Sequence, residues 1–316
     1  MSHPSVLHKR LSHLLPSLLG IVLFGASIWA IAQELRHYPP HTIWHSLTAI
    51  PIQQVGLAIG LMMLNYLDMT GYDALAVRYV GHPVAYGKTA LAAVTSIAVS
   101  NSVGLGLFSG SAVRYRLYST VSVPGVAIVH IIAFCNLSFW LGLFMLGGLV
   151  FILEPVSVPD LLNLPITSVR PLGAVFLIGV LSYLFWNLLS RKPLKFWAFE
   201  FPHLPFHLAL GQVAIATIDW TLATAVFYAL LPASTTLSYL TVCGIYLLAQ
   251  IAGIISNVPG GLGVFETVML LLLGHAIGST TLFGILLAYR VVYYLLPLGT
   301  AVLLLGLYEV RQRMGG

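Results

Sequence analysis

Six ionisable side chains stand inside long apolar stretches of this sequence, where a charge is costly. They are Asp68, Asp73, Arg114, Asp219, Glu266 and Arg290. An ionisable side chain at the centre of a bilayer costs at least about 2.5–3.5 kcal/mol on insertion scales, so such residues by default mark binding or transport sites. The alternative is a structural role, because opposite charges also pair inside helix bundles and hold them together.

The presence of both signs indicates a type of ligand. A substrate with an anionic phosphate and a cationic amine needs arginines and carboxylates in one cavity. The guanidinium fork suits phosphate because it bonds two oxygens at once. Glu266 has a second interpretation, because it opens a helix after a glycine-rich break. A carboxylate at a helix N-terminus is favoured by the helix dipole and the free N–H groups.

The composition places these residues in a membrane. Of 316 residues, 59% are hydrophobic and 7% are charged, whereas soluble domains carry about 25% charged residues. The net charge of +5 is dispersed between apolar spans, which indicates topology signals and anionic lipid, not a nucleic-acid partner. Cys135 and Cys243 lie in apolar spans and predict neither a metal site nor a cofactor.

The apolar stretches predict an all-α polytopic membrane protein. A spanning helix needs about 20 apolar residues, which six stretches satisfy: 14–33, 52–79, 123–153, 171–190, 206–231 and 281–309. The regions 88–120 and 238–277 are each broken in the middle, so we expect two broken re-entrant hairpins. The first stretch ends in Trp29-Ala30-Ile31-Ala32, which also resembles a signal-peptide cleavage site. We favour an uncleaved span.

The two breaks resemble each other. SNSVGLGLFSG (100–110) and ISNVPGGLGVFE (255–266) share a Ser-Asn pair and a G-x-G-x-F run. The flanking spans recur at a similar offset, so a single domain, 1–316, is predicted to contain two repeats, 1–155 and 170–310. Chance is the alternative, because glycine and proline are common in membrane helices. The predicted broken-helix residues are Asn101, Gly104, Gly106, Asn257, Pro259, Gly260, Gly261 and Gly263.

Basic loops predict the sidedness, because lysine and arginine are retained on the cytoplasmic side. Both termini and the segment after the first break are then cytoplasmic, and loops 34–50 and 154–170 are external. Each half crosses three times, so the second half is inverted relative to the first. Inverted-repeat transporters bind substrate near the midplane, where broken helices meet. Backbone groups freed at a break persist at membrane depth only in a polar cavity or buried in protein.

Three segments together carry a resemblance to a known family: SGSAVRYRLYS (109–119), NVPGGLGVFE (257–266) and AYRVVYYLLPL (288–298). The chain resembles the transmembrane flippase domain of the bacterial lysylphosphatidylglycerol synthetase/flippase, the multiple peptide resistance factor. The resemblance extends from the first span to the last. No HExxH, GxSxG or Walker lysine motif is present, so no catalytic residue is predicted.

The resemblance implies a function in aminoacyl-lipid transport. In that family the enzyme transfers lysine or alanine from a charged tRNA to phosphatidylglycerol, and the membrane domain moves the product outward. The outer surface then repels cationic antimicrobial peptides. The matching motifs carry Arg114, Arg116, Glu266 and Arg290 over as residues of the site. With an aspartate from the second or sixth span, the predicted headgroup-binding set is Asp73, Arg114, Arg116, Asp219, Glu266 and Arg290.

The chain stops at Gly316, soon after the last span, so lysyl transfer by this chain alone is not expected. The leading prediction is a flippase or lipid-binding module of the bacterial inner membrane, with an aminoacyl-phosphatidylglycerol as its ligand. One alternative is a membrane platform for a separate aminoacyl-transferase. Another is a secondary transporter of a different phospho-lipid or small solute. A homo-oligomer is compatible with each of them.

Overall fold

The computed structural model describes residues 48–103, 106–155, 168–190, 194–196, 199–201, 203–256, 258 and 261–314. These residues confirm an all-α membrane protein, with one short antiparallel β-hairpin that the sequence did not predict. The elements are α3 (Ile52–Val80), α4 (Tyr86–Val103), α5 (Gly106–Ser119), α6 (Gly125–Leu153), α7 (Arg170–Leu189), β1 (Leu194–Phe196), β2 (Phe199–Phe201), α8 (Phe206–Ala229), α9 (Tyr239–Ile255), α10 (Val264–Ile277), α11 (Ser279–Arg290), the π-helix η3 (Val291–Leu295) and α12 (Leu296–Met314). The predicted first span, 14–33, lies outside the described residues.

Proline sets the start of three of the long helices. Pro51, Pro124 and Pro205 stand at the N-cap positions of α3, α6 and α8. Proline is tolerated there because its fixed φ suits the entry to a helix and the first backbone N–H groups have no partner within the helix. Helix α3 ends at Val80 and is capped by Gly81, whose φ of 68° is in the left-handed region that glycine adopts at helix ends.

Within the described residues, four segments are long and apolar enough to cross a membrane: α6, α7, α8 and the continuous stretch Ser279–Arg311. The predicted span 52–79 is the 29-residue helix α3, which is not among these four. Its length suffices, but it carries Asn65, Asp68 and Asp73. The predicted span 281–309 contains the π-helical turn η3. A π-helical turn inside a helix is rare and is frequently found at functional sites.

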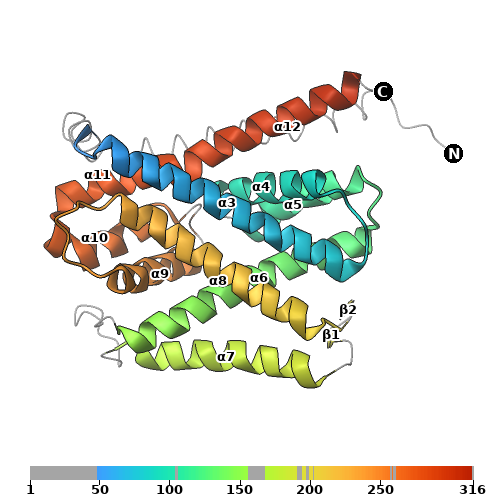
Figure 1. Cartoon of the computed structure of the whole chain (residues 1–316), viewed down its shortest axis with the longest axis horizontal. Helices are drawn as coiled ribbons and strands as arrows, with labels where there is room; N and C mark the ends of the chain where they lie inside the picture. The colour runs from blue at the N-terminus through green and yellow to red at the C-terminus, as the bar shows by residue number, and fades with distance from the viewer. Residues whose placement is uncertain are drawn as a thin grey trace.

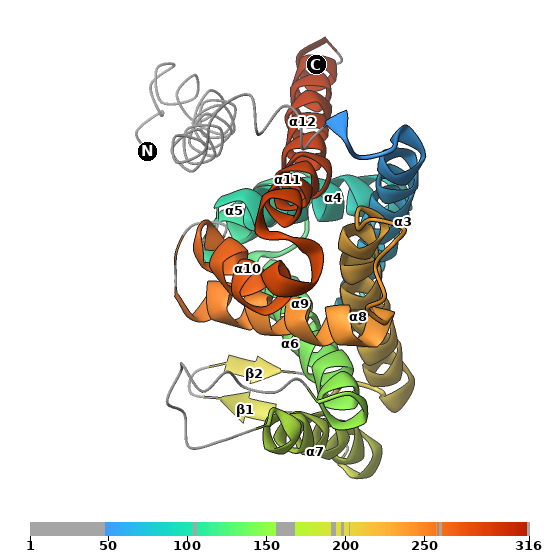
Figure 2. The same cartoon turned by 90° about the vertical axis from the view of Figure 1, so that its left-hand side faces the viewer.

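Both predicted breaks are present as the tips of helical hairpins. Helix α4 ends at Val103 and α5 begins at Gly106, while α9 ends at Ile255 and α10 begins at Val264. These four helices have 14 to 18 residues, which at 1.5 Å per residue is about 21–27 Å. Each is shorter than the hydrocarbon core of about 30 Å. The α4–α5 hairpin approaches the middle of the molecule from the right-hand side of Figure 1 and the α9–α10 hairpin from the left-hand side, which is the side that faces the viewer in Figure 2.

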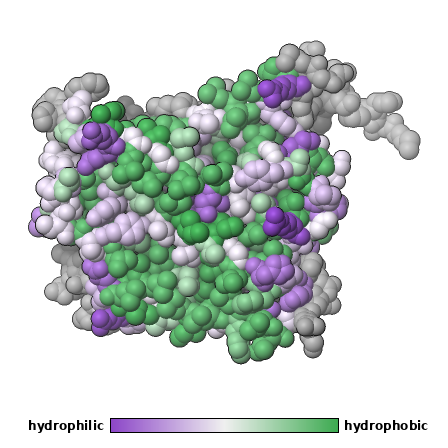
Figure 3. Space-filling view, viewed as in Figure 1, coloured by the Kyte–Doolittle hydropathy of each residue, from purple (hydrophilic) through white to green (hydrophobic). Residues whose placement is uncertain are grey.

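The core lies where the long helices cross between the hairpins. Helices α3 and α8 share the most extensive helix contact, and α6 packs against both. The face shown in Figure 3 is largely apolar over its middle, with hydrophilic residues mostly toward the left and right ends of the view. Helix α7 exposes Val175, Ile178 and Trp186. An apolar band between two polar ends is the surface that a bilayer requires.

Candidate functional site

The first hairpin is joined to α3 by a buried ion pair. Asp73 of α3 and Arg114 of α5 are almost fully buried. The Nε of Arg114 donates to both carboxylate oxygens of Asp73, at 3.1 and 3.2 Å, and its Nη2 donates to Oδ2 at 3.0 Å. The hydroxyl of Tyr118 donates to Oδ1 of the same carboxylate at 2.9 Å. The pair is therefore multiply hydrogen-bonded and inaccessible to solvent.

A second buried pair joins the other hairpin to α11. The Nε of Arg290 donates to Oε1 of Glu266 at 2.6 Å. The other oxygen of Glu266, Oε2, accepts the backbone N–H of Gly263 at 2.9 Å and so caps α10. The guanidinium of Arg290 also lies over the ring of Tyr294, 4.5 Å from the ring centre. One carboxylate oxygen of Glu266 thus caps α10, as the sequence predicts, and the other forms the ion pair with Arg290.

Gly261 and Gly263 shape the second break. Their φ values are 62° and 78°, in the region where a side chain is strained and glycine is not. The Cα of Gly261 also lies 3.4 Å from the position that a Cβ on Gly253 would take, so the end of α9 packs closely against the break. These glycines turn the backbone so that the N–H of Gly263 points at Glu266.

Between the two ion pairs lies a chain of hydrogen bonds centred on Asp219 of α8. Its Oδ1 accepts from Nδ2 of Asn65 at 2.8 Å, and its Oδ2 accepts from the hydroxyl of Tyr72 at 2.6 Å. The hydroxyl of Tyr293, in η3, donates to Oδ1 of Asn65 at 2.7 Å. We call Asn65, Tyr72, Asp219 and Tyr293 the central network.

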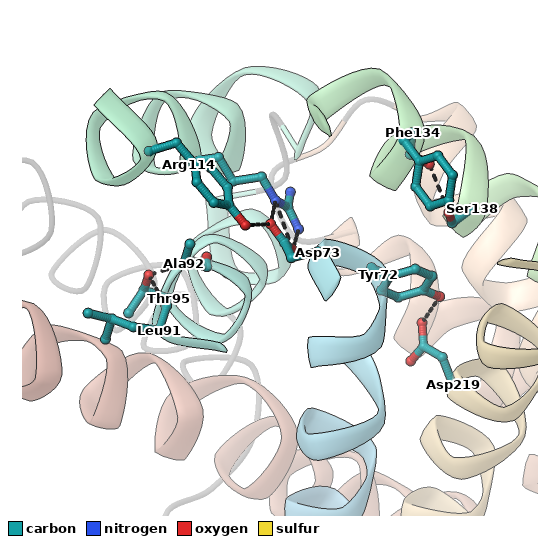
Figure 4. Close-up of polar contacts among 10 residues, drawn as sticks. Tyr72, Asp73, Leu91, Ala92, Thr95, Arg114, Phe134, Ser138 and Asp219 are labelled. Carbon is teal, nitrogen blue, oxygen red and sulfur yellow. Dashed lines mark hydrogen bonds and ion pairs between the residues drawn. The ribbon is translucent and has the colours of Figure 1, made fainter. Parts of the chain in front are cut away.

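Two members of the central network lie close in the sequence to members of the ion pairs. Tyr72 and Asp73 are consecutive on α3 and point in different directions, Tyr72 to Asp219 and Asp73 to Arg114 (Figure 4). Tyr293 follows Arg290 by three residues. A row of buried polar groups therefore runs from α5 through α3 and α8 to η3 and α10. Its ionisable members occur as two separate pairs and one hydrogen-bonded aspartate.

Arg116 lies apart from this row. Its Nη2 donates to Oε1 of Glu309, on α12, at 2.7 Å. The two side chains are 30% and 19% exposed, against 7% or less for each member of the buried pairs. Removing one member of a buried pair costs about 3–5 kcal/mol, while an exposed pair contributes about 0–1 kcal/mol. Of these three pairs, the one at Arg116 is the easiest to open.

The predicted headgroup-binding residues thus fall into four places. Two of these places are the buried pairs, Asp73 with Arg114 and Glu266 with Arg290. The third is Arg116, which pairs with Glu309. The fourth is Asp219, which accepts from two side-chain donors. Asn101 lies in the last turn of α4 and Gly106 is the first residue of α5. Gly104, Asn257, Pro259 and Gly260 lie outside the described residues.

The sequence interpretation missed the uncharged members of the site and one acid. Asn65 and Tyr72 are seven residues apart on α3, with Asp68 between them, which is a spacing for one helix face. That pattern of polar residues in an apolar helix is a signal that finds them. Tyr118, Tyr293 and Glu309 have no such signal, because their partners are distant in the sequence.

A metal centre finds no support in the described residues. No group of three or more histidine, cysteine, aspartate or glutamate side chains within them is placed to hold an ion. The two cysteines are separate, free and buried. The chemistry available to the described site is the binding of charged and polar groups by arginine, carboxylate, amide and phenol.

Comparison with known proteins identifies one family model that matches most of the chain, and several similar proteins. Residues 17–300 match the family described as the lysylphosphatidylglycerol synthase TM region. An uncharacterised protein of Synechocystis, slr0712, is 46% identical over 96% of this chain and 94% of its own length. The inner membrane protein YbhN of Escherichia coli is 33% identical over 81% of this chain and 80% of its own. A phosphatidylglycerol lysyltransferase of Staphylococcus haemolyticus is 24% identical over 94% of this chain but 34% of its own length.

Proposed function

Because the chain belongs to the lysylphosphatidylglycerol synthase transmembrane-region family, we propose that it binds an aminoacyl phospholipid, such as lysylphosphatidylglycerol, and moves it between the leaflets of the bacterial inner membrane. The observation that carries this proposal is the pair of short hairpins that approach the molecule's middle from opposite ends, each held by a buried arginine–carboxylate pair. Short helices that end inside the membrane occur in transporters at the substrate site.

The charges of the site match the charges of such a lipid. Lysylphosphatidylglycerol has one anionic phosphate and two amines. The interior of the helix bundle contains both arginines and carboxylates. We propose that the headgroup contacts Asp73, Arg114, Arg116, Asp219, Glu266 and Arg290 in turn as it moves. The two buried pairs then open only where the lipid supplies replacement charges, since an arginine or carboxylate left alone in this environment is strongly unfavourable.

The broader role follows from the surface charge of the membrane. Movement of a cationic lipid to the outer leaflet lowers the negative charge that attracts cationic antimicrobial peptides. The lipid itself requires an aminoacyl-transferase. The lysyltransferase of Staphylococcus haemolyticus matches this chain over about a third of its own length. We propose that a transferase supplies the lipid to this membrane domain.

Reconstitution tests the proposal. The purified chain is placed in vesicles that carry, in the inner leaflet, a trace of lysylphosphatidylglycerol with a fluorescent label on an acyl chain, and an impermeant quencher is added outside. Movement predicts that the protected fluorescence decays faster than in protein-free vesicles. A double variant, Glu266→Gln with Arg290→Gln, is the matched control, because it removes both charges of one pair together. Equal decay with and without protein would contradict movement of the lipid and would favour the alternative, a lipid-binding platform for a transferase.

A further inference from the structure

One terminal nitrogen of the Arg116 guanidinium is hydrogen-bonded, and the other is buried without a partner among the described residues. Its Nη2 is bonded to Glu309, while its Nη1 is buried and has no hydrogen-bond partner within the part of the chain that the structure describes. Buried polar atoms in native proteins are nearly always hydrogen-bonded. An anion with two oxygens would satisfy both arms at once, in the forked geometry that arginine forms with phosphate.

The surroundings of this pair are polar and reachable. Thr120 lies one helical turn after Arg116, and its hydroxyl is 2.9 Å from the hydroxyl of Tyr308, the neighbour of Glu309. This second contact, between the residue that follows α5 and helix α12, is exposed. Both contacts lie near the C-terminal end of α5, where the first hairpin begins and ends (Figure 1). A lipid at this end of the molecule would meet Arg116 before it met the buried pairs.

We propose that Arg116 and Glu309 form an entry site selective for phospholipids whose headgroup carries both a phosphate and an ammonium group. The phosphate oxygens accept from the two arms of Arg116, and the ammonium donates to the carboxylate of Glu309. The lipid thus replaces each member of the internal pair with a group of the same sign. This inference rests on the proposed function and adds the residues that select the lipid.

The same geometry discriminates against a phosphate without an amine. Phosphatidylglycerol has a phosphate but no amine. If its phosphate binds Arg116, Glu309 loses its bond to Arg116 and receives no ammonium group in exchange, and the phosphate brings a second negative charge close to the Glu309 carboxylate. Repulsion between like charges in the complex with the unwanted ligand is a common source of binding specificity. Glu309 is therefore the selecting residue and Arg116 the anchoring residue.

Binding measurements on the purified full chain in detergent test this assignment. The ligands are lysylphosphatidylglycerol, phosphatidylethanolamine and phosphatidylglycerol, with glycerophosphoethanolamine as the soluble headgroup without acyl chains. The parent should prefer the two amine-bearing lipids about tenfold over phosphatidylglycerol, as expected for one charge-assisted hydrogen bond. The soluble headgroup should bind at least about tenfold more weakly than its lipid, because burial of the acyl chains is missing.

Three variants separate the roles. Glu309→Gln should abolish the preference for amine-bearing lipids while phosphatidylglycerol binds as well as before or better. Arg116→Gln should weaken all three lipids about tenfold. Arg311→Gln, an exposed arginine two residues beyond Glu309, is the matched control and should change each affinity less than about twofold, as expected for an exposed charge.

The outcomes distinguish this inference from the proposed function. If the parent prefers amine-bearing lipids and Glu309→Gln keeps that preference, the selecting site is elsewhere and the entry site is wrong. If Arg311→Gln weakens binding as much as Arg116→Gln, the effect is general charge and the site is also wrong. If the parent shows no preference and moves no lipid in vesicles, the proposed function itself fails.

Discussion

Glu266 makes two contacts, a helix cap and an ion pair, and the substitution Glu266→Gln removes the ion pair while it can keep the cap. Its Oε2 caps the N–H of Gly263 and its Oε1 pairs with Arg290, and the side chain is buried. Glutamine has nearly the same shape and keeps an oxygen for the cap, but it has no charge for the guanidinium. The residue therefore allows the cap and the ion pair to be measured apart.

We expect Glu266→Gln to lower the free energy of unfolding by about 3–5 kcal/mol, because it leaves a buried arginine without its carboxylate. Thermal melting in detergent measures this. The double variant Glu266→Gln with Arg290→Gln should recover part of the loss, since neither charge then remains. Parental melting of the single variant would mean that the pair is not formed in the membrane.

Asp219 gives the second residue-scale prediction. Asn65 and Tyr72 each donate to one of its oxygens, and asparagine can accept from only one of them. Asp219→Asn should cost about 1–3 kcal/mol, the range for a buried hydrogen-bonding group left unsatisfied. Asp68→Asn is the control, because Oδ2 of Asp68 accepts no hydrogen bond from the described residues. An equal loss in both variants would refute the central network.

At the scale of elements, close helix packing depends on glycine at two kinds of position. In α6, a Cβ on Gly142 would lie 2.2 Å from the carbonyl oxygen of Ala216 in α8, whereas a Cβ on Gly179 in α7 would meet nothing within 4 Å. At the second break the requirement is different, because Gly263 has a φ of 78°. One glycine permits contact and the other permits a turn.

Gly142→Ala should therefore destabilise the protein by about 1–3 kcal/mol through overpacking between α6 and α8. Gly179→Ala, in an open position of another helix, should be neutral or slightly stabilising, because alanine is the better helix former. Detergent melting of the two variants compares them directly. If Gly142→Ala melts at the parental temperature, α6 and α8 are not packed as closely as described.

Gly263→Val should block lipid movement while leaving membrane insertion intact. A β-branched residue is strongly disfavoured at this φ, so the break must reorganise and the N–H group that Glu266 accepts is displaced. Gly306→Val, in α12 and with open space around it, is the control. The vesicle decay assay decides: parental rates in Gly263→Val would show that the turn is not required for movement.

The sequence predicts a feature of these elements well when the interactions that cause it are between residues close together in the sequence. The breaks near Gly106 and Gly261 were predictable, because glycine and proline act locally on the backbone. The pairing of Arg114 with Asp73 was not, because it depends on which helix faces which across 41 positions of sequence. The π-helix η3 had no visible local cause either, although it directs Tyr293 toward Asn65.

For the whole molecule, one contact supports an inverted repeat. Asn65 and Asp219 are hydrogen-bonded and 154 residues apart, which is also the distance between the first residues of α3, Ile52, and of α8, Phe206. Where two halves are related by a two-fold axis, a residue close to the axis contacts its own counterpart. We therefore propose that the central network lies near the axis that relates residues 1–155 to 170–310.

The proposed movement of lipid depends on this inversion, because a site between the hairpins must be reachable from both faces of the membrane. Sided cysteine labelling in intact cells tests it directly. The reporters are Ser119→Cys at the end of α5 and Thr280→Cys just after α10, both exposed. The background replaces the buried Cys135 and Cys243 by alanine. We predict that an impermeant maleimide labels position 280 from outside and position 119 only after the membrane is opened. Labelling of both positions from the same side would contradict the inverted arrangement and the transport proposal built on it.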